Sequence, residues 1–180
     1  MNDANPYTAP DASLDNEQND LYQPKIISFS GRIGRLRYLA YGVGNYLLFM
    51  AVMIAVAGIS MVAGGDSTMS VVFVGAMGIL YIAMIVLSVM FAKRRLNDLN
   101  RSGWWFLLFI VPLVNFVMAI YVIFFPGTEG SNNFGPAPVN NSTGVKILAW
   151  MVPVIFVGFG IMAAIAIPAY QDYVMRAAGS

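Results

Sequence analysis

The residues best able to do chemistry lie close together in one short stretch of the chain. Lys93, Arg94, Arg95, Asp98 and Arg101 fall within nine residues. If this stretch is helical, the three arginines lie three or four positions from Asp98 and can share its face, so the carboxylate offsets part of a dense positive charge. Such a patch either fixes orientation at a membrane edge and anchors the chain to headgroups, or forms a specific site for an anionic lipid or a partner's acidic segment.

A second basic cluster lies earlier in the chain, directly before a long apolar stretch. Both clusters together form the candidate lipid- or partner-binding patch, which consists of Arg32, Arg35, Arg37, Lys93, Arg94, Arg95, Asp98 and Arg101. Trp104 and Trp105 follow the second cluster, where we expect the chain to enter the membrane. Tryptophan is enriched at membrane–water interfaces, so both are predicted interfacial anchors.

The chain lacks the side chains on which most enzymes rely. It has no His and no Cys, which removes the commonest acid–base group, the commonest metal ligand and every thiol nucleophile. Beyond residue 20 the acids are single and scattered: Asp66, Asp98, Glu129 and Asp172. We therefore expect no enzyme activity, no metal and no cofactor. Nucleic-acid binding also fits poorly, because the basic residues crowd at the predicted membrane edges.

Four uncharged runs separate these groups and must position them. The runs cover residues 38–65, 69–92, 103–125 and 147–169, each at least 23 residues long, and about 20 helical residues cross a bilayer core. Charged residues make up 11% of the chain, against about 25% in soluble domains. The sequence therefore predicts an all-α, polytopic membrane helical bundle with four hydrophobic segments, and argues against a soluble enzyme.

The third run leaves the topology open. Pro112 and Asn115 lie at its middle, where proline breaks a helix, so the run either spans the membrane or forms a re-entrant pair of half-helices. Basic residues stay on the cytoplasmic side, which predicts a cytoplasmic N-terminus. Spanning leaves Lys146 outside and the C-terminus inside, whereas re-entry leaves Arg176 and the C-terminus outside. Either topology puts nine basic residues inside and one outside, so charge does not decide.

The segments outside the runs complete the predicted organisation. Residues 1–24 are rich in Asn, Asp, Pro and Gln, a composition that cannot bury enough apolar surface to fold alone. They are predicted to be a disordered acidic tail, or alternatively to fold back on the basic cluster that follows. Residues 25–138 then form the membrane domain, 139–146 a linker, and 147–180 a C-terminal transmembrane helix.

Three motifs resemble a known family. They are Phe29 to Tyr38 (FSGRIGRLRY), Arg94 to Trp105 (RRLNDLNRSGWW) and Gly127 to Pro138 (GTEGSNNFGPAP). In this order and spacing they resemble domain-of-unknown-function family 805, small bacterial inner-membrane proteins, over about residues 26–138. The family's usual pattern has His where this chain has Asn97 and an acid where it has Ala137. The resemblance implies a multi-pass protein of the bacterial inner membrane and no established activity.

The last segment resembles a second family. The string AIAIPAYQDYV within residues 159–177 is similar to the N-terminal helix of type IV pilins, although the pilin cleavage site and its Glu are missing. The candidate pilin-like contact residues are Gly160, Ala164, Pro168, Tyr170, Asp172 and Tyr173. In pilins this helix leaves the membrane outward, which favours the re-entrant topology. The small residues at positions 160 and 164 also suit ordinary helix packing in lipid, the simpler interpretation.

We expect a non-enzymatic inner-membrane protein that acts through helix–helix or protein–protein contacts. The resemblance to pilins suggests a link to type IV pilus or secretion machinery, with pilins or pilus assembly proteins as partners besides the lipid bilayer. The alternative is a small transporter or a protein that binds anionic lipid headgroups. The spans contain no ionisable group, and transporters usually place such groups inside their spans. Asn45 and Asn115 are therefore expected to bond neighbouring helices, the alternative being that they line a substrate path.

Overall fold

The computed structural model describes residues 21–62 and 67–179, and every regular element within them is helical. The elements are α2 (Arg35–Val62), α3 (Ser67–Asp98), the 3-10 helix η1 (Gly103–Ile110), α4 (Val114–Phe124) and α5 (Thr143–Ala178). Three of them, α2, α3 and α5, are long and apolar enough to cross a membrane, and α4 is shorter. The predicted all-α class is confirmed. Most of the tail 1–24 lies outside the described residues.

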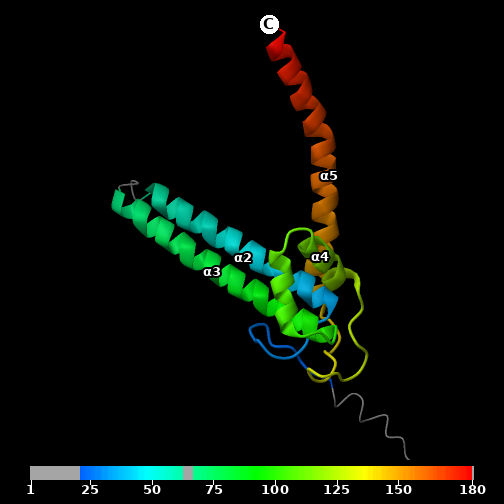
Figure 1. Cartoon of the computed structure of the whole chain (residues 1–180). Coiled ribbons are helices and arrows are strands. Elements are labelled where there is room, and N and C mark those ends of the chain that lie inside the picture. The colour runs from blue at the N-terminus through cyan, green and yellow to red at the C-terminus, as the bar shows by residue number, and fades with distance from the viewer. Residues whose placement is uncertain (1–20, 63–66, 180) are drawn as a thin grey trace, which may run out of the picture.

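The helices α2 and α3 lie side by side as an antiparallel hairpin (Figure 1). Asn45 on α2 makes polar contacts with α3: its Nδ2 donates to the Met84 carbonyl and to Ser88 Oγ, both at 3.2 Å. The prediction that Asn45 bonds a neighbouring helix is therefore confirmed. Both of these hydrogen bonds go from the Asn45 amide to α3, so this side chain joins the two helices of the hairpin.

The third uncharged run forms two short helices instead of one long one. η1 ends at Ile110 and α4 begins at Val114, and Pro112 lies between them, where it cannot donate a backbone hydrogen bond. Leu113 adopts a positive φ of 68° at this break. Eight residues of 3-10 helix cover about 16 Å and eleven of α-helix about 16 Å. Each is about half of the 30 Å hydrocarbon core.

Both ends of this broken segment lie at the same end of the molecule. η1 begins a few residues after Asp98, and beyond α4 the Thr128 backbone N–H donates to the Asp98 carbonyl at 2.9 Å. Within the segment, η1 packs against α3 and α4 packs against η1. The chain from 103 to 125 thus leaves the end of α3 and comes back to it.

The last helix, α5, begins on the bundle and then leaves it. Ser142 caps its first turn by accepting a hydrogen bond from the Val145 N–H at 3.5 Å, and Ala149 is buried where α5 packs on α2. From Pro153 to Gly179 every residue is exposed, and Figure 1 shows this part diverging from α2 and α3. At 36 residues the helix is about 54 Å long, longer than a bilayer core is thick.

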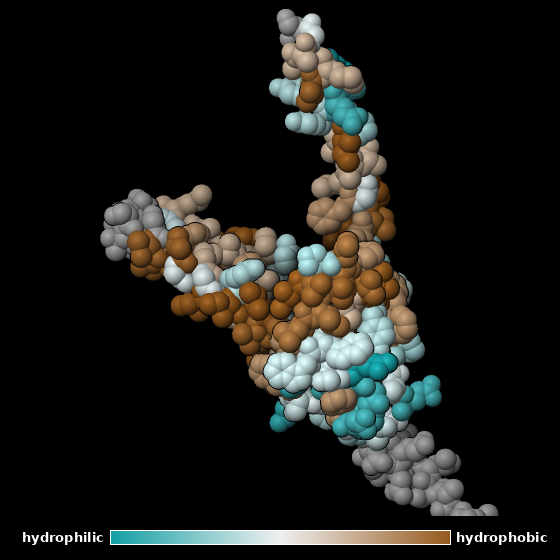
Figure 2. Space-filling model, in the orientation of Figure 1, coloured by the Kyte–Doolittle hydropathy of each residue, from teal (hydrophilic) through white to brown (hydrophobic). Residues whose placement is uncertain are grey.

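Buried side chains gather at one end of the molecule. One core cluster joins the end of α3 to α4 through Leu96, Leu99, Met118 and Val122, and a second surrounds Met90. Away from this end the helices expose a broad apolar surface, and Figure 2 shows it as a brown region next to the paler, polar end. Exposed apolar area of this extent marks a membrane or protein contact surface.

Candidate functional site

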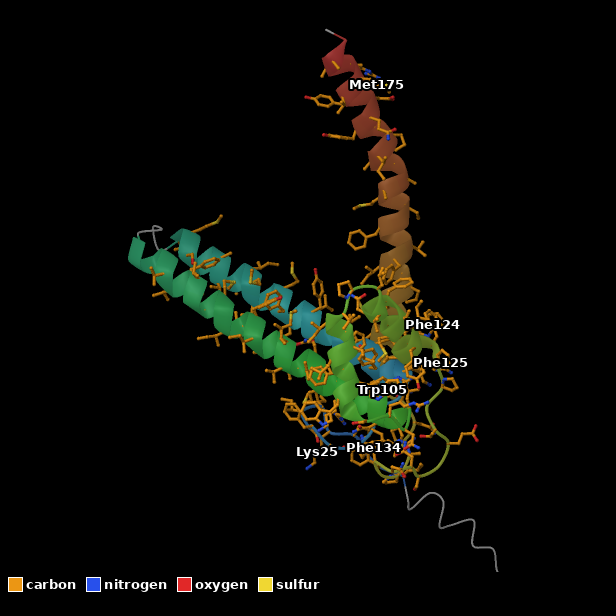
Figure 3. All side chains as sticks on the ribbon, in the orientation of Figure 1. Lys25, Trp105, Phe124, Phe125, Phe134 and Met175 are labelled. Carbon is orange, nitrogen blue, oxygen red and sulfur yellow. The ribbon has the colours of Figure 1, made fainter. Side chains whose placement is uncertain are left out.

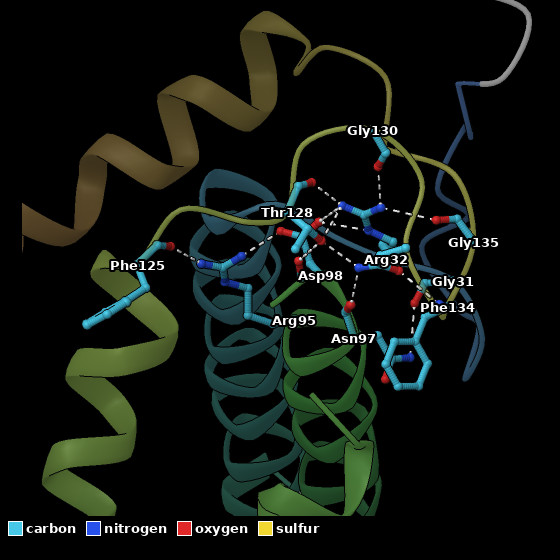
Figure 4. A network of polar contacts seen from close by, with 11 residues as sticks. Gly31, Arg32, Arg95, Asn97, Asp98, Phe125, Thr128, Gly130, Phe134 and Gly135 are labelled. Carbon is cyan, nitrogen blue, oxygen red and sulfur yellow. Dashed lines mark hydrogen bonds and ion pairs between the residues drawn. The ribbon is translucent and has the colours of Figure 1, made fainter. Parts of the chain in front are cut away.

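The polar end of the molecule is built around one carboxylate. Asp98, in the last turn of α3, is 3% exposed and lies between two arginines that are both buried. Its Oδ1 is 3.1 Å from Arg32 Nη2, and its Oδ2 is 2.6 Å from Arg95 Nη1. We call Arg32, Arg95 and Asp98 the Arg–Asp cluster (Figure 4). Two cations against one anion leave the cluster with a net positive charge, which the backbone carbonyls around it offset.

Arg32 binds the chain that follows α4. Its Nη1 donates to the carbonyls of Gly130 at 2.7 Å and Gly135 at 3.1 Å, and its Nη2 donates to the Thr128 carbonyl at 2.5 Å. Both glycines have positive φ, 61° and 115°, a conformation that most side chains disfavour. This turn therefore directs three carbonyls at one guanidinium, and its glycines make that backbone geometry possible.

Arg95 binds the end of α4. Its Nε donates to the Val122 carbonyl at 2.7 Å, and its Nη2 donates to the Phe125 carbonyl. The last carbonyls of a helix have no partner within the helix, so a buried arginine at this place satisfies groups that would otherwise be desolvated without a bond. Arg95 thus holds the returning end of the broken segment against α3.

The carboxylate also leaves no room for a side chain at residue 127. A Cβ on Gly127 would lie 2.1 Å from Asp98 Oδ2 and 2.7 Å from Asp98 Cγ. Next to it, Thr128 Oγ1 donates to the Asp98 backbone carbonyl at 2.9 Å. The chain after α4 therefore passes directly over the cluster, and only glycine fits at the closest point.

The predicted basic patch divides into buried and exposed members. Arg32, Arg37, Arg94, Arg95 and Asp98 are buried. Arg94 Nη1 donates to the carbonyls of Lys25 and Ile26, at 2.8 and 3.2 Å, and Arg37 Nη2 donates to the Asn140 carbonyl at 2.9 Å. Arg35 Nη1 also donates to the Phe124 carbonyl at 3.3 Å, so five of the seven basic residues bind the protein's own backbone. That the patch binds lipid or a partner stays a prediction.

The remaining basic residues lie nearer the surface. Arg35 and Arg101 are exposed and Lys93 is half-buried. Arg101 lies over the Trp105 ring at 5.2 Å, a cation–π geometry, and does not pair with Asp98. Trp104 is 74% exposed and Trp105 39%, which suits the predicted interfacial anchors without testing them.

The candidate pilin-like residues lie apart from this polar end. Gly160, Ala164, Pro168, Tyr170, Asp172 and Tyr173 are all on the diverging part of α5, and all are exposed. Figure 3 shows the labelled Met175 far from the other labelled side chains, beyond the reach of the bundle. The structure therefore has two separate regions of interest, a buried polar cluster and a projecting helix.

Among the residues that the structure describes, no three acidic side chains gather into a group that could hold a metal ion.

The sequence did not reveal the contacts that matter most at the cluster. Arg32 and Asp98 are 66 residues apart, and no spacing rule links such positions. The available signal was the Gly-rich stretch after α4, whose three glycines at 127, 130 and 135 all touch or face the cluster.

The chain was also compared with known proteins. The model of a family described as "Protein of unknown function (DUF805)" matches residues 26–136, which confirms the first resemblance. "Inner membrane protein YhaI" of Escherichia coli (strain K12) is 30% identical over 113 residues, 62% of this chain and 86% of the relative.

A second relative matches over a shorter stretch. "Inner membrane protein YhaH" of the same strain is 47% identical over 45 residues. The match covers 25% of this chain and 37% of that relative's length. No solved structure matches. The family match ends before α5 begins, so the resemblance to pilins stays a prediction.

Proposed function

Because this chain belongs to the DUF805 family, in which the relatives named above are inner membrane proteins, we propose that it is a non-enzymatic, multi-pass protein of the bacterial inner membrane. It acts through contacts between α5 and another membrane protein. The observation that carries this proposal is the exposure of α5 from Pro153 to Gly179. A helix that leaves its own bundle has an apolar surface free for a partner helix.

The way the polar end is assembled supports one of the two topologies. We place residues 103–125 as a re-entrant segment, because its two short helices are each about half a bilayer thick and both of its ends lie at Asp98. Arg32, Arg95 and the turn around Gly130 then lie on one side of the membrane. The basic residues assign this side to the cytoplasm.

With residues 103–125 re-entrant, the chain crosses the membrane three times, through α2, α3 and α5. The two termini then lie on opposite sides of the membrane. α5 starts from the cytoplasmic side at Thr143, and its uncharged part ends near Ala169, about 39 Å further along the helix. Tyr170, Asp172 and Tyr173 then emerge on the periplasmic side. A type IV pilin has the same direction at the similar sequence, which supports pilins or pilus assembly proteins as the partners.

Small residues on α5 supply the contact. Gly160 and Ala164 lie one turn apart on one face, and a Cβ at Gly160 would meet no atom of another described element within 4 Å. Small residues spaced in this way let two helices approach closely in lipid, where van der Waals packing drives association. Gly158 is equally open but lies about 200° around the helix from Gly160, so it is the matched control.

Co-purification from native membranes tests this function. The tagged full-length chain is expected to recover type IV pilin or pilus platform proteins, and Gly160→Leu is expected to reduce the recovery while Gly158→Leu does not. Deletion of residues 159–180 should abolish it. If the deletion leaves every recovered partner unchanged, α5 is not the contact surface and the proposal is wrong.

A further inference from the structure

A second polar site lies beside the Arg–Asp cluster, in a pocket of about 640 Å³ between the end of α3, the start of η1 and the loops before α2 and after α4. Four aromatic side chains line it: Phe29, Trp104, Phe106 and Phe134. The pocket also holds one cation, Lys93, and one buried amide, Asn97. Its mixture of aromatic, cationic and amide groups suits a ligand with an apolar part and a phosphate.

Two polar groups in the pocket, Asn97 Oδ1 and the Lys93 ammonium, have no partner among the residues that the structure describes. Asn97 is 4% exposed, and its Nδ2 donates to the Gly31 carbonyl at 3.3 Å, as Figure 4 shows. Its Oδ1 is buried, and no residue that the structure describes donates to it. The Lys93 ammonium likewise has no acid or carbonyl partner among residues 21–62 and 67–179. A buried acceptor without a donor is costly, which indicates that a ligand supplies one.

The side chain of Lys93 is held in place by the chain opposite. A Cβ on Gly103 would lie 2.5 Å from Lys93 Cγ, so the aliphatic part of the lysine packs directly on this glycine. Its position on the pocket wall is therefore set by the fold and is not that of a freely moving surface lysine.

The polar groups are ordered by depth. Val89, Lys93 and Asn97 line the pocket four residues apart on one face of α3, each about 6 Å further along the helix. α3 runs from the apolar belt towards the polar end, which Figure 2 shows at the lower end of the bundle. From the membrane outward, the pocket thus offers an apolar wall, then a cation, then a hydrogen-bond acceptor.

We propose that this pocket binds the headgroup of a membrane phospholipid, with the phosphate at the Lys93 ammonium and a donor of the headgroup at Asn97 Oδ1. The acyl chains follow the apolar wall at Val89 and Phe106. A phospholipid presents its acyl chain, phosphate and headgroup donor in this same order of depth. The acceptor at Asn97 favours headgroups with a hydroxyl or ammonium proton over phosphatidylcholine, whose quaternary ammonium has none.

The site differs from the basic patch that the sequence predicts. Five arginines of that patch bind the protein's own carbonyls, whereas Lys93 has no such bond within the part of the chain that the structure describes. Of the predicted residues, only Lys93 and Trp104 line this pocket.

Native mass spectrometry of the full-length protein in neutral detergent tests the site. Phosphatidylglycerol, phosphatidylethanolamine and phosphatidylcholine are titrated, with sn-glycerol 3-phosphate as a soluble phosphate ester. The two lipids with headgroup donors should bind more tightly than phosphatidylcholine. Lys93→Gln should weaken the binding of all three lipids about tenfold, because one charge-assisted hydrogen bond is lost. Lys25→Gln is the control, since Lys25 is exposed and does not line the pocket.

Two further variants separate the parts of the site. Asn97→Leu should remove the preference over phosphatidylcholine. Trp104→Ala, at a 74% exposed position, should weaken the binding of lipid and leave the binding of glycerol phosphate unchanged. The proposal is overturned if Lys93→Gln behaves like Lys25→Gln. It is also overturned if glycerol phosphate binds as tightly as the lipids, because the ligand is then a soluble phosphate ester.

Discussion

Neutralising Asp98 should destabilise the protein more than any other single change of an acid. Asp98→Asn removes the negative charge that lies 3.1 Å from Arg32 Nη2 and 2.6 Å from Arg95 Nη1. Both guanidinium groups are about 99% buried or more, so they stay in the protein without a counter-charge. Breaking a buried ion pair by removing one partner costs about 3–5 kcal/mol. We therefore expect the free energy of unfolding to fall by about 3 kcal/mol.

The measurement is an SDS titration of the purified protein in mixed micelles, followed by tryptophan fluorescence. The matched control is Asp172→Asn, the same chemical change at an exposed position of α5, which should alter stability by less than about 0.5 kcal/mol. An Asp98→Asn protein within about 1 kcal/mol of the unmodified protein would refute the structural role of the cluster.

A double-mutant cycle isolates the pair itself. Arg32→Gln is combined with Asp98→Asn, and the coupling energy is the amount by which the two costs fail to add. Because Arg32 and Asp98 share a direct contact, the coupling should exceed about 1 kcal/mol. Additive costs would mean that each residue stabilises the protein separately and that their contact contributes nothing.

Two further predictions concern the groups around and beyond the cluster, measured by the same titration. Gly127→Ala should destabilise by about 2 kcal/mol or more, because its Cβ would lie 2.1 Å from Asp98 Oδ2 and overpacking costs about 1–3 kcal/mol. Gly144→Ala, in the first turn of α5 with open space around it, should cause no loss of stability, because alanine suits a helix better than glycine; equal losses in the two variants would exclude the clash. Asn45→Leu should cost about 1 kcal/mol, since it loses the bonds to α3, including the one to Ser88 Oγ; an unchanged midpoint would show that the hairpin does not depend on them.

Much of the fold could be predicted because it depends on local composition. Runs without charge are long enough to span a bilayer, and α2, α3 and α5 lie on three of the four predicted runs. The break in the third run was also visible, since proline interrupts a helix wherever it stands. The sequence did not show the direction of the chain after Pro112. That direction depends on the hydrogen bond from Arg95 to the Phe125 carbonyl, a contact across 30 residues.

The candidate site was harder to predict, because the burial of a charge is set by tertiary structure. Near membrane edges arginine usually serves orientation and headgroup binding, and the patch was assigned on this basis. In the structure Arg32 meets Asp98 from 66 residues away, and Arg94 meets the Lys25 carbonyl from 69 residues away. Only the short-range pair, Arg95 with Asp98, follows from helical spacing.

The most direct test of the account is the side of the membrane on which two positions lie. The chain has no Cys, so Ser131→Cys and Gly179→Cys each give a single thiol, both at exposed positions. A membrane-impermeant maleimide is applied to intact spheroplasts. If the Arg–Asp cluster draws the loop after α4 back to the cytoplasmic side, Cys labelling is absent for Ser131→Cys and present for Gly179→Cys. The reverse pattern, a labelled loop and a protected C-terminus, would mean that residues 103–125 cross the membrane and would contradict the account.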